Sequence, residues 1–191
     1  MGLTFPVNPA LDPKEQKLGE LILYVSQKSA SDIYYGSTKL NKILYFSDFL
    51  SYRNWDDPIT GVEYFHLPQG PAPRRLLPVR KYLIASGWLQ LQVIQFPDGK
   101  TQHKPVNLRE PDLDLFKARH ISLVDSVIET LQGLNATETS NFSHLEVGWQ
   151  LTRKGETIPY PMVFLSTKLL TPVDRKRAEQ VIREEEGRAV A

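Results

Sequence analysis

The chain has 191 residues, 41% of them hydrophobic and 24% charged, and its 23 Lys and Arg against 22 Asp and Glu give a net charge of +1. This composition is typical of a globular protein. It excludes a disordered chain and a globally basic nucleic-acid binder, while a local basic patch stays open. Cysteine is absent, which excludes disulfides, thiolate metal sites and thiol catalysis.

The sequence shows no targeting or membrane signal. Its first residues lack a charged region followed by an apolar core, and no apolar run approaches the roughly 20 residues of a membrane span. We therefore expect a cytoplasmic protein with no membrane partner. Because no repeat or sharp shift in composition divides the chain, we expect one α+β domain over residues 1–191. It should be mostly α-helical, with a short strand, one β-hairpin of wing-like outline, an extended arm at residues 1–11 and a charged helix at residues 172–191.

Two amphipathic helices are expected in the first third of the chain. Asp12 is a good N-cap and Pro13 a good first helical residue, so the first helix should run to about Ser29. The second should begin with Ser37 or Thr38 as N-cap and end at Asp56-Asp57-Pro58, since proline has no amide hydrogen. Apolar residues at i, i+3, i+4 and i+7 give each helix a buried stripe. The stripes are Leu18, Leu21, Ile22 and Val25 in the first helix, and Leu40, Ile43, Leu44 and Ser47, widened by Tyr45, Phe46 and Phe49, in the second.

A strand, a turn and a third helix are expected next. Residues 62–67 are rich in β-formers, and Gly70-Pro71 turns the chain. The regular part of the helix should follow Pro78, because proline inside a helix kinks it, and the helix should end at Gly87.

A β-hairpin is expected over residues 88–108. Its turn contains Asp98-Gly99, a strong hairpin signal. The apolar residues of the first strand change face between Val93 and Ile94, which suggests a β-bulge or a change in what the strand packs against. Pro105 predicts that the second strand lies at an edge, because proline cannot donate to a neighbouring strand.

Helices are expected in most of the remaining chain. Residues 111–120 suggest a short helical turn, and residues 137–149 suggest one helix with Thr137 as its N-cap, followed by a loop over residues 152–161. Between them lies another helical stripe, which Gly133 and Asn135 end. It contains Val124, Val127, Ile128, Leu131 and Leu134. Residues 172–188 predict a charged surface helix, with partner docking as the alternative. Its apolar face is limited to Ala178, Val181 and Ile182.

No catalytic or metal-binding pattern is found. The chain has no G-x-S-x-G nucleophile elbow and no glycine-rich phosphate loop. Asp56-Asp57 before Pro58 indicates a helix-ending turn rather than a catalytic pair. The histidines fall in different predicted elements without metal-ligand spacing; they are His66, His103, His120 and His144. We therefore expect no enzyme activity, no catalytic residue, no metal and no cofactor.

Basic residues surround the predicted third helix and hairpin. They are Arg74-Arg75, Arg80-Lys81 and Lys100. A helix followed by a basic hairpin is the outline of a winged-helix DNA reader. The balanced composition favours a solvated face whose charges are offset by acids elsewhere. DNA binding by a transcriptional regulator is therefore the alternative function and not the favoured one.

A second unusual concentration lies near the end of the chain. It combines Ser143-His144-Leu145-Glu146 and Trp149 with Ile158-Pro159-Tyr160. Trp149 can be a core residue and Ile-Pro-Tyr an ordered loop. Alternatively, the Trp, His and Tyr side chains form a surface that grips a protein partner. The residues alone leave both interpretations open.

Five short motifs, in their order and spacing, resemble one protein family. They are Lys39-Leu40-x-Lys42-x-Leu44-Tyr45-Phe46, Gly70-Pro71, Ser86-Gly87-Trp88, Ser143-His144-x-Glu146-x-x-Trp149 and Gly155-Glu156-x-Ile158-Pro159-Tyr160. Over residues 18–160 the chain is similar to the Panacea domain, the SocA-like antitoxin family also seen in phage-associated proteins. The regular hairpin and the proline-rich segment before it depart from the family pattern and keep the DNA-facing alternative open.

The resemblance implies a helical domain of a type II toxin–antitoxin system, active in phage defence, that binds and neutralises a cognate protein toxin. In one branch of the family the antitoxin resembles a proteolytic adaptor, which would make a protease a second partner. The candidate partner-binding or motif residues that the resemblance carries are Lys39, Tyr45, Phe46, Gly70, Pro71, Ser143, His144, Glu146, Trp149, Pro159 and Tyr160.

Overall fold

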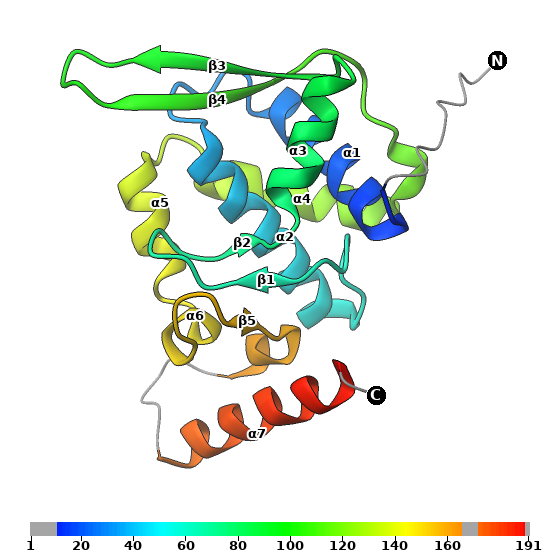
Figure 1. Cartoon of the computed structure of the whole chain (residues 1–191), viewed down its shortest axis with the longest axis vertical. Helices are drawn as coiled ribbons and strands as arrows, with labels where there is room; N and C mark the ends of the chain where they lie inside the picture. The colour runs from blue at the N-terminus through cyan, green and yellow to red at the C-terminus, as the bar shows by residue number, and fades with distance from the viewer. Residues whose placement is uncertain (1–10, 166–171, 190–191) are drawn as a thin grey trace.

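The computed structural model describes residues 11–165 and 172–189, and this part of the chain is α+β and mostly helical, as predicted (Figure 1). Its elements are α1 (Pro13–Lys28), α2 (Ser37–Trp55), β1 (Tyr64–Phe65), β2 (Ala72–Pro73), α3 (Leu76–Ala85), β3 (Leu89–Gln95), β4 (Thr101–Asn107), η1 (Leu113–Leu115), α4 (Ala118–Leu131), α5 (Ala136–Ser143), α6 (Val147–Leu151), β5 (Thr157–Ile158), η2 (Tyr160–Phe164) and α7 (Pro172–Ala189). The predicted arm lies, except for Leu11, outside the described residues. None of the described helices is both long and apolar enough to span a membrane.

Helix α1 begins where the sequence predicts. The Asp12 carboxylate accepts a hydrogen bond from the Glu15 amide (2.8 Å), and the Glu15 carboxylate accepts one from the Asp12 amide (3.1 Å). This reciprocal pair satisfies two donors at the helix start. The predicted apolar stripe is confirmed, because each of its members is 0% exposed: Leu18, Leu21, Ile22 and Val25.

Helix α2 runs through the centre of the molecule and contacts α1, α4, α5, β2 and η2 (Figure 1). Its N-cap is Gly36, so the prediction of Ser37 or Thr38 is wrong. The Ser37 hydroxyl donates instead to the His103 carbonyl (3.1 Å), because the hairpin lies against this end of the helix. As predicted, the helix ends before Pro58, with Asp56 in the left-handed region (φ 53°).

A small antiparallel sheet in the order β2-β1-β5 joins distant parts of the chain. Tyr64 of β1 pairs with Pro73 of β2 and with Ile158 of β5. The strand predicted over residues 62–67 is confirmed only as β1. Strand β5 lies in a segment that the sequence predicts as loop, because only its pairing with β1 makes it a strand.

Asp48 connects α2 to this sheet. Its carboxylate is 0% exposed and accepts hydrogen bonds from the Thr60 amide (2.7 Å), the Thr60 hydroxyl and the Tyr64 hydroxyl (2.8 Å). Burial raises the pKa of Asp48, and these hydrogen bonds oppose the rise. No sequence pattern predicts this role for Asp48.

Helix α3 begins at Leu76, so the prediction that its regular part follows Pro78 is wrong. Pro78 lies in the first turn, where an amide hydrogen has no acceptor within the helix, and proline is tolerated there. The predicted end is confirmed. Gly87 has φ 71°, and its amide and that of Trp88 donate back to carbonyls of the last turn (3.0 and 2.9 Å).

Strands β3 and β4 form the predicted hairpin, which projects beyond the helices (Figure 1). Pairing is continuous from Leu89 with Asn107 to Gln95 with Thr101, so of the two predicted alternatives the bulge is wrong. The apolar residues change face without a bulge because burial is weak here: Val93 is 58% exposed. As predicted, Pro105 lies on an edge strand, since β4 pairs with β3 alone in the described part of the chain.

The helix predicted over residues 137–149 is two short helices, α5 and α6, so that prediction is wrong. The N-cap of α5 is Asn135 and not Thr137, because the Asn135 side chain accepts a hydrogen bond from the Thr137 amide (2.9 Å). At the end of α5, the amides of Leu145 and Glu146 donate to carbonyls three residues earlier, which tightens and ends the helix. The chain therefore turns a corner between α5 and α6.

The remaining helices follow the predictions. Helix α4 contains the predicted stripe, except that Leu134 lies beyond its end, and Gly133 follows it with φ 77°. Element η1 is the predicted short turn. Helix α7 is the predicted charged helix; it buries Ala178 (1% exposed) and contacts η2.

Replacing Asp48 with Ala should strongly destabilise the fold. The change leaves the Tyr64 hydroxyl and the Thr60 amide buried without this acceptor, and we expect a loss of at least about 2 kcal/mol in the free energy of unfolding. Urea unfolding followed by circular dichroism measures it. Asn54→Ala, at an exposed position of the same helix, is the control and should not destabilise, because Ala favours helix. Equal losses in the two variants would contradict the role given to Asp48.

Candidate functional site

Three segments that are distant in sequence meet at the corner between α5 and α6. They are the middle of α2, the loop over residues 66–71, and the α5–α6 junction with the start of α6. We call the contacting residues the corner cluster: Lys42, His66, Gly70, Pro71, Ser143, His144 and Trp149. Most of them are predicted site residues. Lys42 appears in the sequence only within a motif and His66 only as a scattered histidine, so neither is predicted from the sequence as a site residue.

Lys42 is the buried cation of the corner cluster. Its side chain is 1% exposed, and its ammonium donates to the Pro71 carbonyl (3.0 Å). No carboxylate forms an ion pair with it among the described residues. Burial lowers the pKa of Lys42 to about 7. This lysine therefore titrates near neutral pH.

Position 70 requires glycine for two reasons, its backbone conformation and its close packing. Its φ of 93° lies in the left-handed region, and a Cβ atom would lie 2.1 Å from Ser143 Oγ and 2.9 Å from Lys42 Nζ. Ser143 is 0% exposed, and its hydroxyl donates to the Ser140 carbonyl (2.7 Å). The loop and the end of α5 are therefore in close contact here.

Two histidines stack on the indole of Trp149. The ring centroids of His144 and Trp149 are 3.9 Å apart, and those of His66 and Trp149 are 4.4 Å apart, with nearly parallel planes in both pairs. The indole N–H donates to the Leu67 carbonyl (3.0 Å). Burial and the nearby Lys42 lower the pKa of His144, which favours its neutral form. Its Nε2 atom is buried without a hydrogen-bond partner in the described part of the chain.

Glu146, the next predicted site residue, precedes α6 and is half-buried. Burial raises the pKa of its carboxyl, and the charge of Arg53 opposes the rise. The pKa of Tyr45 is raised by burial and, to a smaller extent, by the charge of Glu146. The carboxyl therefore lies close enough to the core to act on a buried side chain.

The other candidates on α2 are core residues. Lys39 is 1% exposed, and its Nζ atom lies 2.6 Å from Oδ2 of Asp32, with which it forms an ion pair. Asp32 is also buried. Tyr45 and Phe46 are 1% and 6% exposed. The ring of Phe46 lies 5.3 Å from that of Phe142 in α5, so these aromatic residues pack α2 against its neighbours.

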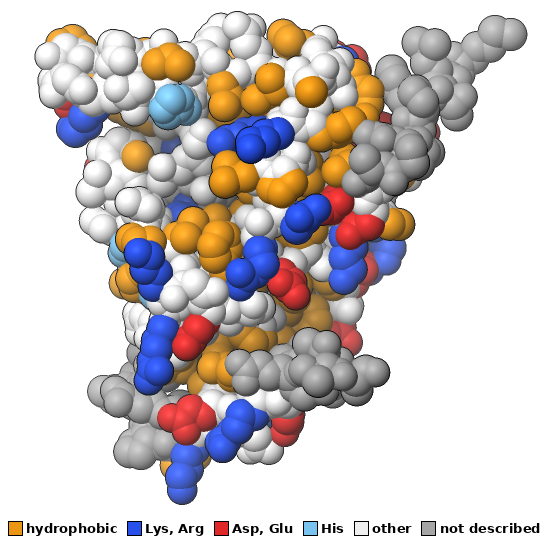
Figure 2. Space-filling model, in the orientation of Figure 1, with side chains coloured by type: hydrophobic (Ala, Val, Ile, Leu, Met, Phe, Trp, Pro, Cys, Tyr) orange, Lys and Arg blue, Asp and Glu red, His pale blue; other side chains and the backbone are white. Residues whose placement is uncertain are grey.

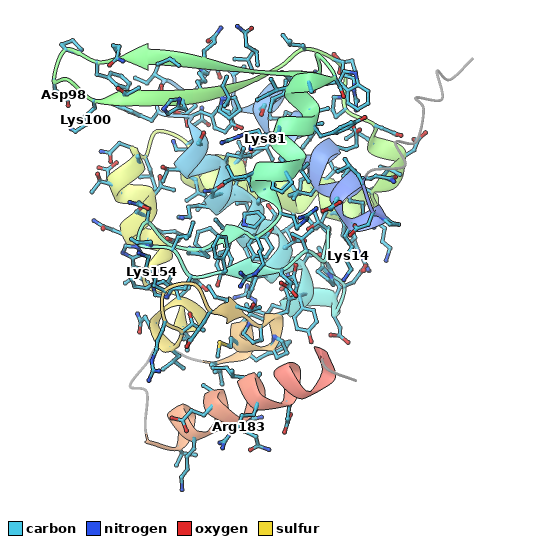
Figure 3. All side chains as sticks on the ribbon, viewed as in Figure 1. Lys14, Lys81, Asp98, Lys100, Lys154 and Arg183 are labelled. Carbon is cyan, nitrogen blue, oxygen red and sulfur yellow. The ribbon has the colours of Figure 1, made fainter. Side chains whose placement is uncertain are left out.

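Pro159 and Tyr160 lie in the wall of a pocket. The Tyr160 hydroxyl donates to the Val62 carbonyl (2.8 Å), and its ring stacks on Phe49 (4.6 Å). The pocket has a volume of about 600 Å³ and is also lined by Lys14, labelled in Figure 3, and by residues of α7. It shares no lining residue with the corner cluster. The two late motifs are nevertheless joined through His66, whose amide donates to the Glu156 carbonyl (2.9 Å) and whose carbonyl accepts from the Gly155 amide (2.9 Å).

The basic residues near α3 and the hairpin are mostly paired with carboxylates. The pairs are Arg74 with Glu63 (3.3 Å), Arg75 with Glu15, and Lys100 with Asp98 (2.7 Å). Figure 3 shows the last pair at the hairpin tip, away from Lys81 on α3. On the face in Figure 2, basic side chains are scattered among hydrophobic and acidic ones. The helix–hairpin outline is present, but its charges favour a solvated face over a DNA-binding one.

Several basic side chains surround Asp57, which follows the end of α2. Its Oδ2 atom forms ion pairs with Lys117 and Arg119 (2.7 Å to the latter) and lies 3.2 Å from His120 Nε2. These cations hold the pKa of Asp57 well below its usual range, and burial lowers that of His120. Over residues 11–165 and 172–189, no group of three or more His, Asp or Glu side chains is arranged to hold a metal ion.

The described residues form a helical α+β fold with a small sheet, a projecting hairpin and a buried polar corner. The family model described as "Antitoxin SocA-like, Panacea domain" matches residues 40–150, more than half of the chain. The chain therefore belongs to the SocA-like Panacea family. The match contains the whole corner cluster, whereas Lys39, Pro159 and Tyr160 lie outside it. No curated protein and no solved structure matches the chain.

Gly70→Ala should destabilise the protein more than the same change at Gly155. Both residues have positive φ (93° and 88°), so both variants store backbone strain of about 1–3 kcal/mol. Only at Gly70 does the new methyl group also collide with Ser143 and Lys42, while at Gly155 nothing lies within 4 Å. We expect an additional loss of about 1–3 kcal/mol for Gly70→Ala. Chemical denaturation measures both variants, and equal losses would contradict the packing described for the corner cluster.

Stability should rise with pH between about 7 and 10.5 through Lys42. Its pKa is about 7 in the folded protein and near 10.5 in the unfolded chain, so within this window the unfolded chain binds more protons. The free energy of unfolding then increases with pH. Below the window both states are protonated and the penalty for burying the charge is present in full. Above it, the penalty is absent.

The test compares urea unfolding midpoints of the wild type and Lys42→Met across this pH range at constant ionic strength. The variant has no proton to lose at this site, so its profile should rise less than that of the wild type. Parallel profiles would show that Lys42 does not titrate as its burial requires.

Proposed function

We propose that this chain is the antitoxin of a type II toxin–antitoxin pair and neutralises a cognate protein toxin by binding it, without catalysis. Membership of the SocA-like Panacea family supports an antitoxin-like role with a protein partner. The observation that carries the proposed binding site is the exposed apolar surface beside the corner cluster. The corner is closely packed inside and exposes two apolar side chains, which suits a preformed protein-binding site.

The proposed toxin-binding surface consists of Phe142 and Leu145, which we call the corner face. Their side chains are 42% and 60% exposed. The Leu145 amide donates to the Phe142 carbonyl (3.3 Å), so the two residues belong to the same tight turn. Phe142 also contacts Phe46 of α2, which holds its ring in place. Rigid aromatic and aliphatic side chains of this kind are common anchors of protein interfaces.

The burial of Ser143 supports binding rather than catalysis. Its hydroxyl is 0% exposed and donates to a backbone carbonyl, although the cluster also holds Lys42 with its lowered pKa. A nucleophile must reach its substrate and be activated by a base within hydrogen-bond distance. In our proposal the corner cluster therefore supports a contact surface.

Co-expression with the product of the neighbouring gene tests the function. We expect the neighbour to stop growth when expressed alone and growth to recover when this chain is present. A neighbour that is harmless alone would remove the main support for the proposal. We also expect the amount of toxin to stay constant during rescue, because binding alone suffices. A fall in toxin that requires a cellular protease would instead indicate proteolytic delivery.

Leu145→Asp and Phe142→Asp should each weaken toxin binding at least about 30-fold. A charge placed in the centre of an apolar contact must be desolvated, and losses at such anchor positions exceed about 2 kcal/mol. Isothermal titration calorimetry measures the affinity, and growth rescue should fall in parallel.

Leu77→Asp is the matched control, because Leu77 is 57% exposed on α3, away from the corner. It should leave affinity and rescue unchanged. Circular dichroism melts of all three variants separate a binding defect from unfolding. Full affinity in both corner variants would exclude the corner face as the toxin-binding surface.

A further inference from the structure

Strand β3 carries an open edge. The Phe96 amide donates to the Lys100 carbonyl (2.9 Å), and the Leu108 amide donates to the Trp88 carbonyl (2.8 Å). Because hydrogen bonds alternate along an antiparallel pair, the backbone groups of residues 90, 92 and 94 point toward β4. Those of Leu91, Val93 and Gln95 point away from it.

These outward backbone groups are unused within the described part of the chain. Strand β3 pairs with β4 alone, and no other described residue bonds the backbone of Leu91, Val93 or Gln95. In Figure 1, β3 forms the outer rim of the hairpin, with no element beyond it. The edge therefore offers a row of free donors and acceptors at strand spacing.

The two edges of the hairpin are protected differently. Proteins commonly protect edge strands with charges, prolines or bulges. The β4 edge has Pro105, whose missing amide hydrogen would point outward, and the outward carbonyl of His103 accepts a hydrogen bond from Ser37. Strand β3 (LQLQVIQ) has no charge, no proline and no bulge. It is thus fit for pairing with another strand.

We propose that β3 is a self-association edge through which two copies of this chain form a twofold antiparallel dimer. The strand order of the joined sheet is β4-β3-β3-β4. An uncharged strand is complementary to itself, because a twofold pair of charged strands would place like charges opposite each other. In one possible register, Gln92 of one copy lies opposite Gln92 of the other, and Leu91 lies opposite Val93. In another, Val93 of one copy lies opposite Val93 of the other.

The dimer also explains how the projecting hairpin is stabilised. A two-stranded ribbon is marginal alone in water, whereas a sheet of three or more strands is more stable. Figure 1 shows the tip of the hairpin beyond the helices, where they give it little support. The inference does not depend on the antitoxin role, since it concerns a different face of the molecule.

Sedimentation velocity and light scattering of the full chain over a concentration series test the proposal. We expect a reversible dimer of twice the 21.8 kDa chain mass, with a dissociation constant on the order of micromolar because one strand pair buries a small area. Val93→Pro removes an outward amide hydrogen, and Val93→Lys places two lysines directly opposite or diagonal to each other, according to the register. Each should raise the dissociation constant at least tenfold. Thr101→Pro removes an outward amide hydrogen on the β4 edge and should leave it unchanged.

Cysteine cross-linking provides a second measurement, because the natural chain contains no cysteine. Gln92→Cys or Val93→Cys, according to the register, should form a disulfide-linked dimer under mild oxidation, and Thr101→Cys should not. A monomer at every concentration would overturn the proposal. So would a dimer that survives both Val93 variants, or one that Thr101→Pro disrupts equally.

Discussion

Helix α2 carries charged side chains into the core, and the burial of each requires a partner from another part of the chain. A buried polar or charged group without a partner costs more free energy than a single packing contact returns. The pairs are Lys39 with Asp32 before the helix, Lys42 with the Pro71 carbonyl, and Asp48 with Thr60 and Tyr64. These partners fix the chain before the helix, the Gly70-Pro71 turn and the small sheet around α2. The arrangement of the first half of the molecule depends on them.

The corner cluster follows from the same constraint. Once Lys42 holds the Pro71 carbonyl, Gly70 lies against Ser143, and the two histidines stack on Trp149. The family motifs therefore describe an interior scaffold more than a contact surface. Phe142 directly precedes a motif and Leu145 lies within it, and the side chains of both are exposed on the outside of that scaffold. In the proposed function, the motif residues position the surface and neighbouring residues make the contact.

Local signals predicted the fold well wherever the cause lies within a few residues. Asp12 with Glu15 starts α1, Gly87 ends α3, and Asp98-Gly99 turns the hairpin, because capping and turn conformations depend on short segments. Two of the wrong predictions concern competing local options. Pro78 is predicted to precede the regular part of α3, but the first turn of a helix tolerates proline. The prediction of a single helix over residues 137–149 does not include the turn that ends α5. The bulge is absent because an exposed hairpin does not require its apolar residues to stay on one face.

The sequence by itself determined the helical class, the main apolar stripes, the hairpin and the family motifs, since periodicity and spacing are local properties. Only the tertiary structure decided that Lys42 and His66 belong with Ser143, His144 and Trp149. It also placed Pro159 and Tyr160 in a separate pocket and left the outer edge of β3 open. The physical reason is that burial and pairing depend on which distant segments meet. The sequence does not show which segment of the chain will contact a given lysine, histidine or strand edge.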